Sequence, residues 1–334
     1  MDNEQILDVT ALEASAGRKP PAADLKVIDH LDELALTWLD SAIVGCACIG
    51  PAERLHAVLI AADDVCATAA SITIPLAAID GASEIKRDAP FGSLWLLPGM
   101  RESLRVNGRI DGVEGDTVTV AVTECFAHCG KALIRSSFWS ATETVGARQQ
   151  ELAQAVASSQ LLLLATAGDD GTADLSPKGD PAGALLQLID EELCFPDRPG
   201  NRRTDSFRNI LRQPRVALIA LTPGSSTVVT AQGVAMLTTD RSLRERFAVD
   251  GKVPTMVTRI SALVATVHDS HVLQRVRPWP VTAPLADLNA ATLFAAHVKA
   301  NKAKSISARI AKALVAIPGA LNKELEKDYK KNLY

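Results

Sequence analysis

The chain has 334 residues, which is enough for two domains of ordinary size. Apolar residues make up 47% of it and charged residues 22%, a balance that excludes a disordered chain. The formal net charge of −4 argues against general nucleic-acid binding, which needs a broad basic face, and no apolar run has the length of a membrane span.

The N-terminus and the cysteines predict the compartment. The first ten residues are acidic and contain no apolar core, so they do not read as a secretory signal, and the six cysteines are scattered. We therefore expect reduced thiols and a cytoplasmic protein. Cys125 and Cys129 flank His128, but their spacing matches no zinc pattern with a second pair of ligands, and we expect no metal site.

The first half of the chain predicts a short helical start followed by strands. Residues 1–25 are polar and rich in proline and alanine, which is typical of a loose arm, and apolar residues at helical spacing predict a helix over 25–41. Apolar runs broken by glycine, proline and aspartate then predict strands and turns. They cover residues 42–74, 93–97, 103–110 and 117–127, with a short basic helix or turn over 130–139.

The second half predicts a similar course. Helices are expected over 149–159 and over 240–248, the latter capped by Thr239 or Asp240. The predicted strands cover residues 161–167, 173–175, 185–189, 193–195, 216–221, 227–237 and 255–266. The last 50 residues predict three helices, over 285–300, 305–317 and 322–332.

The most informative stretch is FPDRPGNRRTDSFRNI, residues 195–210. Six arginines fall between residues 198 and 215 in a chain that is acidic as a whole. Prolines and a glycine predict a loop, and Thr204 or Asp205 is expected to cap a helix that ends near residue 212. A helix N-terminus offers free amides to an anion and arginine offers a fork of donors, so this loop suits a phosphate group. The alternative is a solvated basic turn.

The two halves resemble each other. VAVTECFAHCGKALIRSSFW, residues 120–139, aligns without a gap on ISALVATVHDSHVLQRVRPW, residues 260–279. This alignment pairs His128 with His268 and Trp139 with Trp279, and identical leucine and arginine residues lie between them. The chain therefore reads as two copies of one β-rich unit followed by a helical tail.

Each copy has kept a part that the other has lost. The second copy contains SPKGD and RPGNRRTDS, whereas the corresponding region of the first, residues 66–91, is shorter and has no arginine pair. The first copy keeps its closing segment, which includes Lys131 and Arg135, and the second has diverged there. We expect one composite site to be retained and its symmetric counterpart to be lost.

These segments resemble the pyridoxamine 5′-phosphate oxidase-like FMN-binding split barrels, and in particular their "probable FMN-dependent enzyme" subgroup. The resemblance lies in residues 176–224 of the second copy, in LPGMRESLRVNGRI and CFAHCGKALIRSSFW of the first, and in the ending KDYKKNLY. It covers residues 90–140 and 150–334, while residues 25–90 are covered only through the repeat. In this family two barrels pack face to face and FMN lies between them.

The resemblance implies a set of cofactor-binding residues from both copies. The second copy would supply the phosphate loop, with Ser176, Lys178, Arg198, Asn201, Arg202, Arg203 and Ser206. The first copy would close the other side with His128, Lys131, Arg135 and Trp139. Structural roles stay open for three of them: Asn201 as a turn residue, Trp139 as a packing residue, and His128 as the donor or acceptor of a structural hydrogen bond.

The sequence therefore predicts a mainly β protein of two tandem antiparallel split barrels with flanking helices. We expect a first barrel at residues 1–145, a second at 146–280 and a helical tail at 281–334. The expected function is that of an FMN-dependent oxidoreductase or oxidase acting on a small molecule, in an intramolecular pseudo-dimer that could associate further. No catalytic residue is assigned. The alternatives are a non-catalytic flavin- or heme-binding protein and a deazaflavin-dependent reductase.

Overall fold

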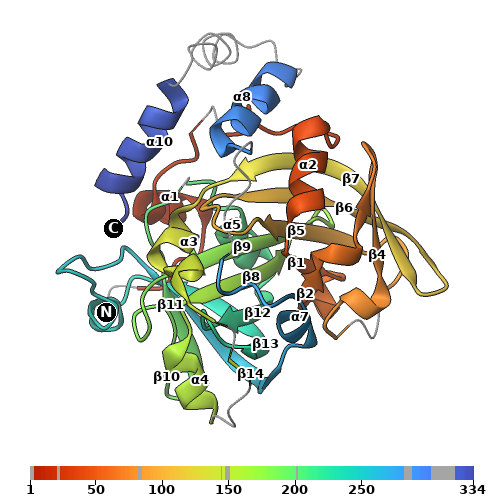
Figure 1. The fold of residues 1–334 in the computed structure, drawn as a ribbon. Coiled ribbons are helices and arrows are strands. Elements are labelled where there is room, and N and C mark those ends of the chain that lie inside the picture. Colours follow the sequence, from red (N-terminus) through yellow and green to blue (C-terminus); the bar gives the residue numbers. More distant parts are fainter. Residues whose placement is uncertain are drawn as a thin grey trace.

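The structure is a computed structural model that describes residues 4–20, 23–81, 85–143, 145–146, 151–200, 202–281, 288–301 and 320–334. Two antiparallel sheets of seven strands each form its centre, and helices flank them (Figure 1). The predicted fold class is confirmed. Within the described residues, no helix is both long and apolar enough to cross a membrane.

The first sheet has the strand order β2-β1-β5-β6-β7-β4-β3 and the second has the order β10-β11-β14-β13-β12-β8-β9. The strands of the first sheet are β1 Val44–Ile49, β2 His56–Ala61, β3 Cys66–Ala67, β4 Ser71–Pro75, β5 Pro90–Leu96, β6 Ser103–Glu114 and β7 Thr117–His128. The strands of the second are β8 Leu161–Ala167, β9 Ala173–Gly179, β10 Gln187–Ile189, β11 Glu192–Pro196, β12 Arg215–Leu221, β13 Thr227–Thr238 and β14 Val257–Asp269.

The sheets have the same topology. When the second order is read from its other end, each strand number is that of the first sheet raised by seven. A register shift interrupts β6 against β7 at Gly108 and β13 against β14 at Gly233, so both copies keep a glycine bulge. A Cβ on Gly108 would lie 1.9 Å from the carbonyl oxygen of Ala121, and one on Gly233 would lie 2.5 Å from that of Ser261. The structure thus supports the predicted repeat.

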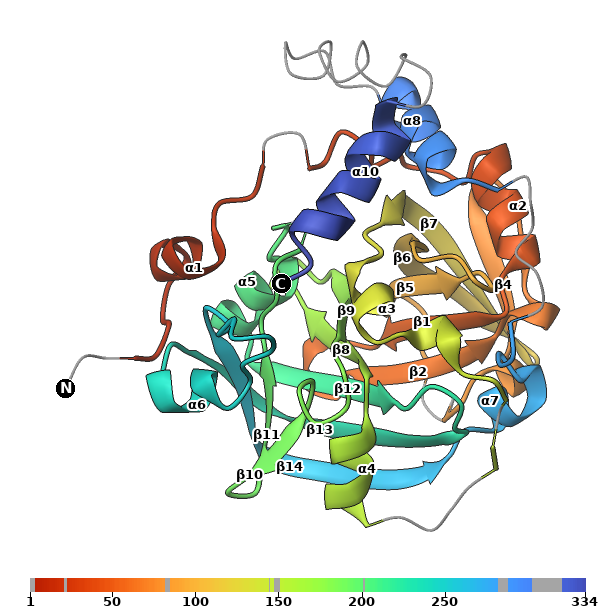
Figure 2. The ribbon, with the colours of Figure 1, turned by 60° about the vertical axis from the view of Figure 1, so that its left-hand side comes forward.

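A shared apolar layer joins the two sheets. Every residue of β8 is buried, and its alternate side chains belong to different clusters. Leu162 and Leu164 pack in the core of the second sheet, whereas Leu161 and Leu163 pack in one continuous cluster with β1 and β5 of the first. The seam between the units is therefore built like the interior of a domain, and Figure 2 shows β8 and β9 lying beside the first sheet.

The N-terminal arm crosses from one unit to the other. Helix α1 (Val9–Ala16) packs in the core of the second sheet through Leu12, and Ile6 donates a backbone hydrogen bond to Leu237. The helix predicted over 25–41 is shorter than expected, because α2 covers only Glu33–Ser41. The segment before it contains a turn at residues 23–26 and a single β-bridge, in which Ile28 pairs with Cys125 of β7. Its apolar spacing serves to cover the sheet rather than to form a helix.

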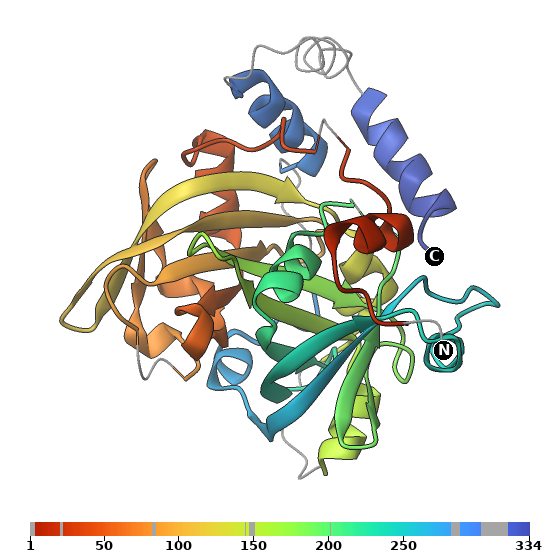
Figure 3. The same ribbon diagram turned by 180° about the vertical axis from the view of Figure 1, so that it is seen from behind.

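The remaining helices flank the sheets. They are α3 Lys131–Arg135, α4 Leu152–Ser158, α5 Asp205–Arg212, α6 Arg241–Glu245, α7 His271–Val276, α8 Ala290–Ala300 and α10 Ala320–Lys331. The predicted helix at 240–248 is thus confirmed as α6, and Asp240 is its cap. The helix predicted over 305–317 lies outside the described residues. Figure 3, the view from behind, shows α1 and α10 on the same side of the molecule.

The glycine at the bulge of the first sheet gives a test of how tightly the backbone packs there. Gly108→Ala should lower the free energy of unfolding by about 1–3 kcal/mol, because the added methyl group meets backbone that must shift. Gly112→Ala, on the same strand with no atom within 4 Å of the added Cβ, is the control and should change little. Urea denaturation of both variants makes the comparison, and equal stabilities would contradict the packing argument.

Candidate functional site

A cleft of about 500 Å³ opens where the two units meet. This volume lies within the usual range for small-molecule sites. The first unit contributes the ends of β6 and β7 and helix α3, and the second contributes β9, the loop after β11 and the start of α5. Residues of the N-terminal arm, residues 252–255 before β14, and Tyr334 complete the lining.

The loop after β11 has an unusual backbone at the cleft. Arg202 and Thr204 adopt left-handed conformations, with φ of 56° and 55°, which residues other than glycine seldom do. Thr204 precedes α5 but its side chain makes no capping hydrogen bond, since its hydroxyl oxygen accepts from Arg208 Nε instead. The prediction that Thr204 or Asp205 caps this helix is therefore wrong, and the first-turn amides have no side-chain cap at the cleft.

Buried ion pairs form the floor of the cleft. Asp180 is 1% exposed, and its Oδ2 accepts a hydrogen bond of 2.7 Å from Arg198 Nε. Arg198 Nη2 also donates to the carbonyl of Phe247, and Arg135 Nε lies 3.8 Å from the same carboxylate. Burial raises the pKa of Asp180, while the neighbouring arginines oppose that shift. This network ties the end of β9 to the loop after β11.

Arg135 joins three segments through backbone carbonyls. It is 8% exposed, its Nε donates to Gly179, and its Nη1 donates to both Pro199 at 3.1 Å and Leu333 at 2.8 Å. Helix α3 of the first unit is thereby fixed to β9 and to the loop of the second unit. Gly179 is required at this contact, because a Cβ there would lie 2.0 Å from the carbonyl oxygen of Ala132.

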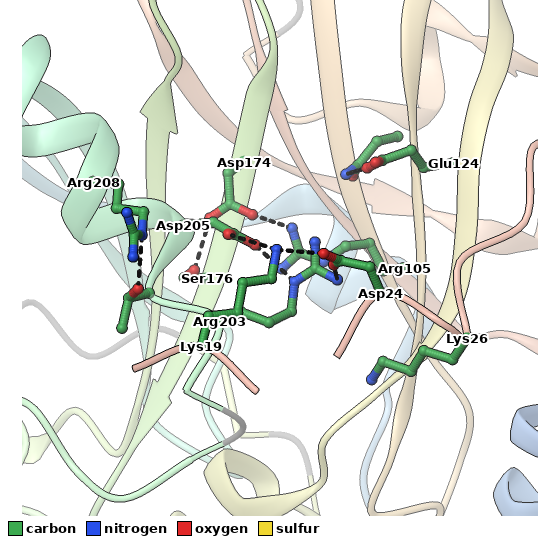
Figure 4. Close-up of polar contacts among 12 residues, drawn as sticks. Lys19, Asp24, Lys26, Arg105, Glu124, Asp174, Ser176, Arg203, Asp205 and Arg208 are labelled. Atoms are coloured by element: carbon green, nitrogen blue, oxygen red, sulfur yellow. Dashed lines mark hydrogen bonds and ion pairs between the residues drawn. The ribbon is translucent and has the colours of Figure 1, made fainter. Parts of the chain in front are cut away.

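A second charged network lies along the other side of the loop (Figure 4). Arg203 pairs with Asp205 at 2.7 Å and with Asp24 of the N-terminal arm at 2.9 Å, and its guanidinium lies 4.7 Å from the ring centroid of Phe126. Arg105 of the first unit pairs with Asp174 and donates to the carbonyl of Leu175. Arginines from both units thus meet over one aromatic ring.

Two buried polar atoms of the first unit that lie at the cleft have no hydrogen-bond partner among the described residues. Arg105 is 3% exposed, but its Nε makes no hydrogen bond, and neither does the buried Nδ1 of His128. Both residues line the cleft. Burial, together with the charge of Arg105, lowers the pKa of His128 well below its usual value, so its imidazole is neutral at pH 7. Unsatisfied buried donors of this kind favour a ligand in the cleft.

Lys178 and Ser176 are held by aspartates on the second unit. The Lys178 ammonium lies 3.6 Å from Asp197 and 4.1 Å from the ring centroid of Phe207, and burial lowers its pKa. The hydroxyl of Ser176 donates to Asp174 Oδ2 at 2.7 Å. Both side chains therefore reach the cleft in fixed positions.

Comparison with known proteins identifies the second unit. Residues 149–278 match the family described as Pyridoxamine 5′-phosphate oxidase. This segment belongs to the pyridoxamine 5′-phosphate oxidase family. The match contains the whole second sheet together with the phosphate loop, so the loop and β9 are parts of a pyridoxamine 5′-phosphate oxidase-like domain.

Solved structures resemble part of this chain at low identity. HupZ of Group A Streptococcus is 16% identical, with 37% of this chain and 96% of that chain covered and a TM-score of 0.30. An F420 reductase is 16% identical, with coverages of 35% and 98% and a TM-score of 0.27. The FAD binding protein from Mycobacterium smegmatis is 13% identical, with coverages of 37% and 98% and a TM-score of 0.24. No curated protein matches the chain.

The structure brings most of the predicted cofactor-binding residues together. Nine of them line the cleft, namely Ser176, Lys178, Arg198, Arg202, Arg203, Ser206, His128, Lys131 and Arg135. Trp139 does not line it: its Nε1 donates to the carbonyl of Met100, and its ring packs edge-on against Phe138. Asn201 lies outside the described residues. Within the described residues, no group of His, Cys, Asp and Glu side chains is arranged to hold a metal ion.

Several residues in and around the site were not predicted from the sequence. Arg105 and Lys26 each have an apolar residue on both sides in the sequence. This pattern is the one sequence signal that such a charged side chain is buried. Lys26 is 7% exposed and donates to the carbonyl of Ala127 at 2.7 Å, and burial lowers its pKa to about 8. Asp180 and Tyr334 carried no signal of their roles.

The pKa of Lys26 predicts a pH effect on stability. Since the folded value of about 8 lies below that of the unfolded chain, the folded state binds fewer protons between the two values, and stability rises with pH there. Between pH 8 and 10 the free energy of unfolding should rise by about 2 kcal/mol because of Lys26. The Lys26→Met variant should not show this increase in stability with pH, as measured by urea titrations at pH 8, 9 and 10. The same pH slope in both proteins would contradict it.

Proposed function

We propose that the protein is an FMN-dependent oxidoreductase that binds one FMN in the cleft between its units and acts on a small molecule. The observation that carries the proposal is the start of α5, where the first-turn amides have no side-chain cap and lie at a cleft that also presents cationic side chains. Such a helix start binds phosphate through its amides and its dipole.

The residues at this position fit a phosphate monoester. The left-handed conformations of Arg202 and Thr204 alternate with Arg203, a backbone pattern that turns successive amides toward one anion. Ser206 is 2% exposed and lies in the first turn of α5. Arg202, Arg203 and Ser206 would therefore hold the phosphate, while Lys178 and Ser176 on β9 would lie along the rest of the cofactor.

The first unit would supply the opposite side of the cleft. The unpartnered Arg105 Nε and His128 Nδ1 can each make a hydrogen bond to a polar edge of the ligand. Flavin, when bound, would supply the hydride or electron transfer itself, so the protein residues need only bind, orient and exclude water. This division of labour agrees with the lack of an assigned catalytic residue.

The counterpart of this cleft on the other side of the seam argues for one cofactor per chain. Helix α7 is the counterpart of α3, and its Arg275 pairs with Asp63 and Asp64 just after β2. His271 pairs with Asp80. The groove beside them, of about 310 Å³, is lined by described residues that include neither lysine nor arginine. The described lining of this groove thus contains one carboxylate, Asp80, and none of the lysines and arginines that line the retained cleft.

The first test is an absorbance spectrum with a count of flavin per chain after denaturation. One FMN per chain is expected. Two per chain would contradict the argument from the acidic counterpart, and none after added FMN would overturn the proposal in favour of a heme or deazaflavin. Reduction of the bound flavin by a nicotinamide cofactor and its reoxidation by air would then separate an enzyme from a binding protein.

Substitutions at the phosphate loop give a sharper test. Arg202→Ala with Arg203→Ala should weaken FMN binding by at least about tenfold, because hydrogen bonds to charged groups contribute about 1.5–3 kcal/mol each. Ser206→Ala should weaken it less. Arg212→Ala is the control, since this exposed arginine of the same helix pairs with Asp169 outside the cleft. Equal affinities for all variants in a fluorescence titration would refute the placement of the phosphate.

A further inference from the structure

Helix α10 contacts α8, and the residues after it lead to Tyr334, which lines the cleft. We refer to residues 320–334 as the strap. Figure 2 shows α10 running from beside α8 down to the end marked C, which lies close to α5 in that view. The helical part of the strap contacts the first unit, and its last residue contacts the second unit. The strap therefore spans both units.

The helical part of the strap is anchored on the first unit. Asp328 pairs at 2.8 Å with Lys131, which is itself 3% exposed, and Glu326 pairs with Arg101. The hydroxyl of Tyr329 donates to Glu102 at 2.8 Å and accepts from the backbone amide of Gly130 at 3.2 Å. The anchor therefore holds the residues that immediately precede and begin α3.

The end of the strap reaches the cationic floor of the cleft. Tyr334 lines the cleft, and its ring centroid lies 5.4 Å from the guanidinium carbon of Arg198 and 6.0 Å from that of Arg135. Its backbone carbonyl accepts from Lys252 at 3.2 Å. Burial and the nearby carboxylate of Asp180 raise the pKa of the Tyr334 phenol to about 12, so it stays neutral at pH 7. An aromatic ring thus covers two arginines from different units.

One nitrogen links the strap to the phosphate loop. Arg135 Nη1 donates both to Leu333 of the strap and to Pro199 of the loop, and Arg135 makes its third hydrogen bond to Gly179. Because all three acceptors are backbone carbonyls, Arg135 fixes segments in place rather than presenting its donors to a ligand. If the strap left, the guanidinium would lose a partner and gain exposure, and its hold on Pro199 would weaken.

From these contacts we infer that the strap closes the cleft over its ligand and, through Arg135, keeps the phosphate loop in its binding conformation. Tyr334 is then a positioning residue of the site. The inference concerns regulation of the proposed flavin site and rests on that function for its ligand, but the coupling between strap and loop is a property of the protein alone.

The coupling can be measured without any ligand. Hydrogen exchange of the ligand-free chain should show faster exchange of the amides of residues 202–208 when residues 320–334 are deleted, and also in Tyr334→Ala. Lys323→Ala, an exposed change on α10, is the matched control and should leave exchange unchanged. Unchanged exchange in the deletion variant would overturn the inference, whatever the ligand is.

The closing role is measured with FMN. Deletion of the strap should raise the dissociation rate of bound FMN by about tenfold or more, the effect of one lost charge-assisted hydrogen bond, and should increase quenching of flavin fluorescence by iodide. Asp328→Asn should give a smaller change in the same direction. If FMN binds stoichiometrically and neither quantity changes, the strap does not close the site. If the full chain binds no FMN, the proposed function fails, and hydrogen exchange alone decides the coupling.

Discussion

Strand β8 has no polar face, and this constraint organises the molecule. A sheet whose strands are apolar on both sides must be covered on both sides, and here the second cover is the first unit of the same chain. The seam that results is a packed core rather than a surface contact. The cleft exists because the apolar layer ends where α3, β9 and the phosphate loop converge, and charged groups replace it there.

At that point, carboxylates that pair with the arginines set the orientation of the cations. Asp180 engages Arg198, and Asp205 and Asp174 engage Arg203 and Arg105. Unpaired arginine side chains in one cleft would repel one another and turn toward solvent. Arginines that pair with carboxylates keep fixed orientations instead. Among the described residues that line the cleft, Arg105 Nε and His128 Nδ1 are buried polar atoms without a hydrogen-bond partner.

The sequence predicts the topology well because the repeat, the bulge glycines and the alternation are local signals. The sequence also predicts that the loop after β11 and α3 share one site, and both line the cleft. This prediction is possible because each copy has visibly lost the segment that the other has kept. Prediction from the sequence fails where tertiary packing overrides spacing, as in the segment before Glu33, which covers a strand instead of coiling. The assignment of Arg135 to the ligand stays a prediction, and the structure adds that this side chain joins backbone segments. No periodicity indicates that Tyr334 returns to the cleft.

Because both units lie in one polypeptide, the cleft responds to dilution differently from a cleft between two separate chains. A cleft shared by two separate chains falls apart when the protein is scarce, and its occupancy then depends on protein concentration. Here the partner is tethered, and its effective concentration is set by the linker instead of by expression. A tethered cleft can therefore work at very low abundance, and each half is free to change without altering a second copy of itself.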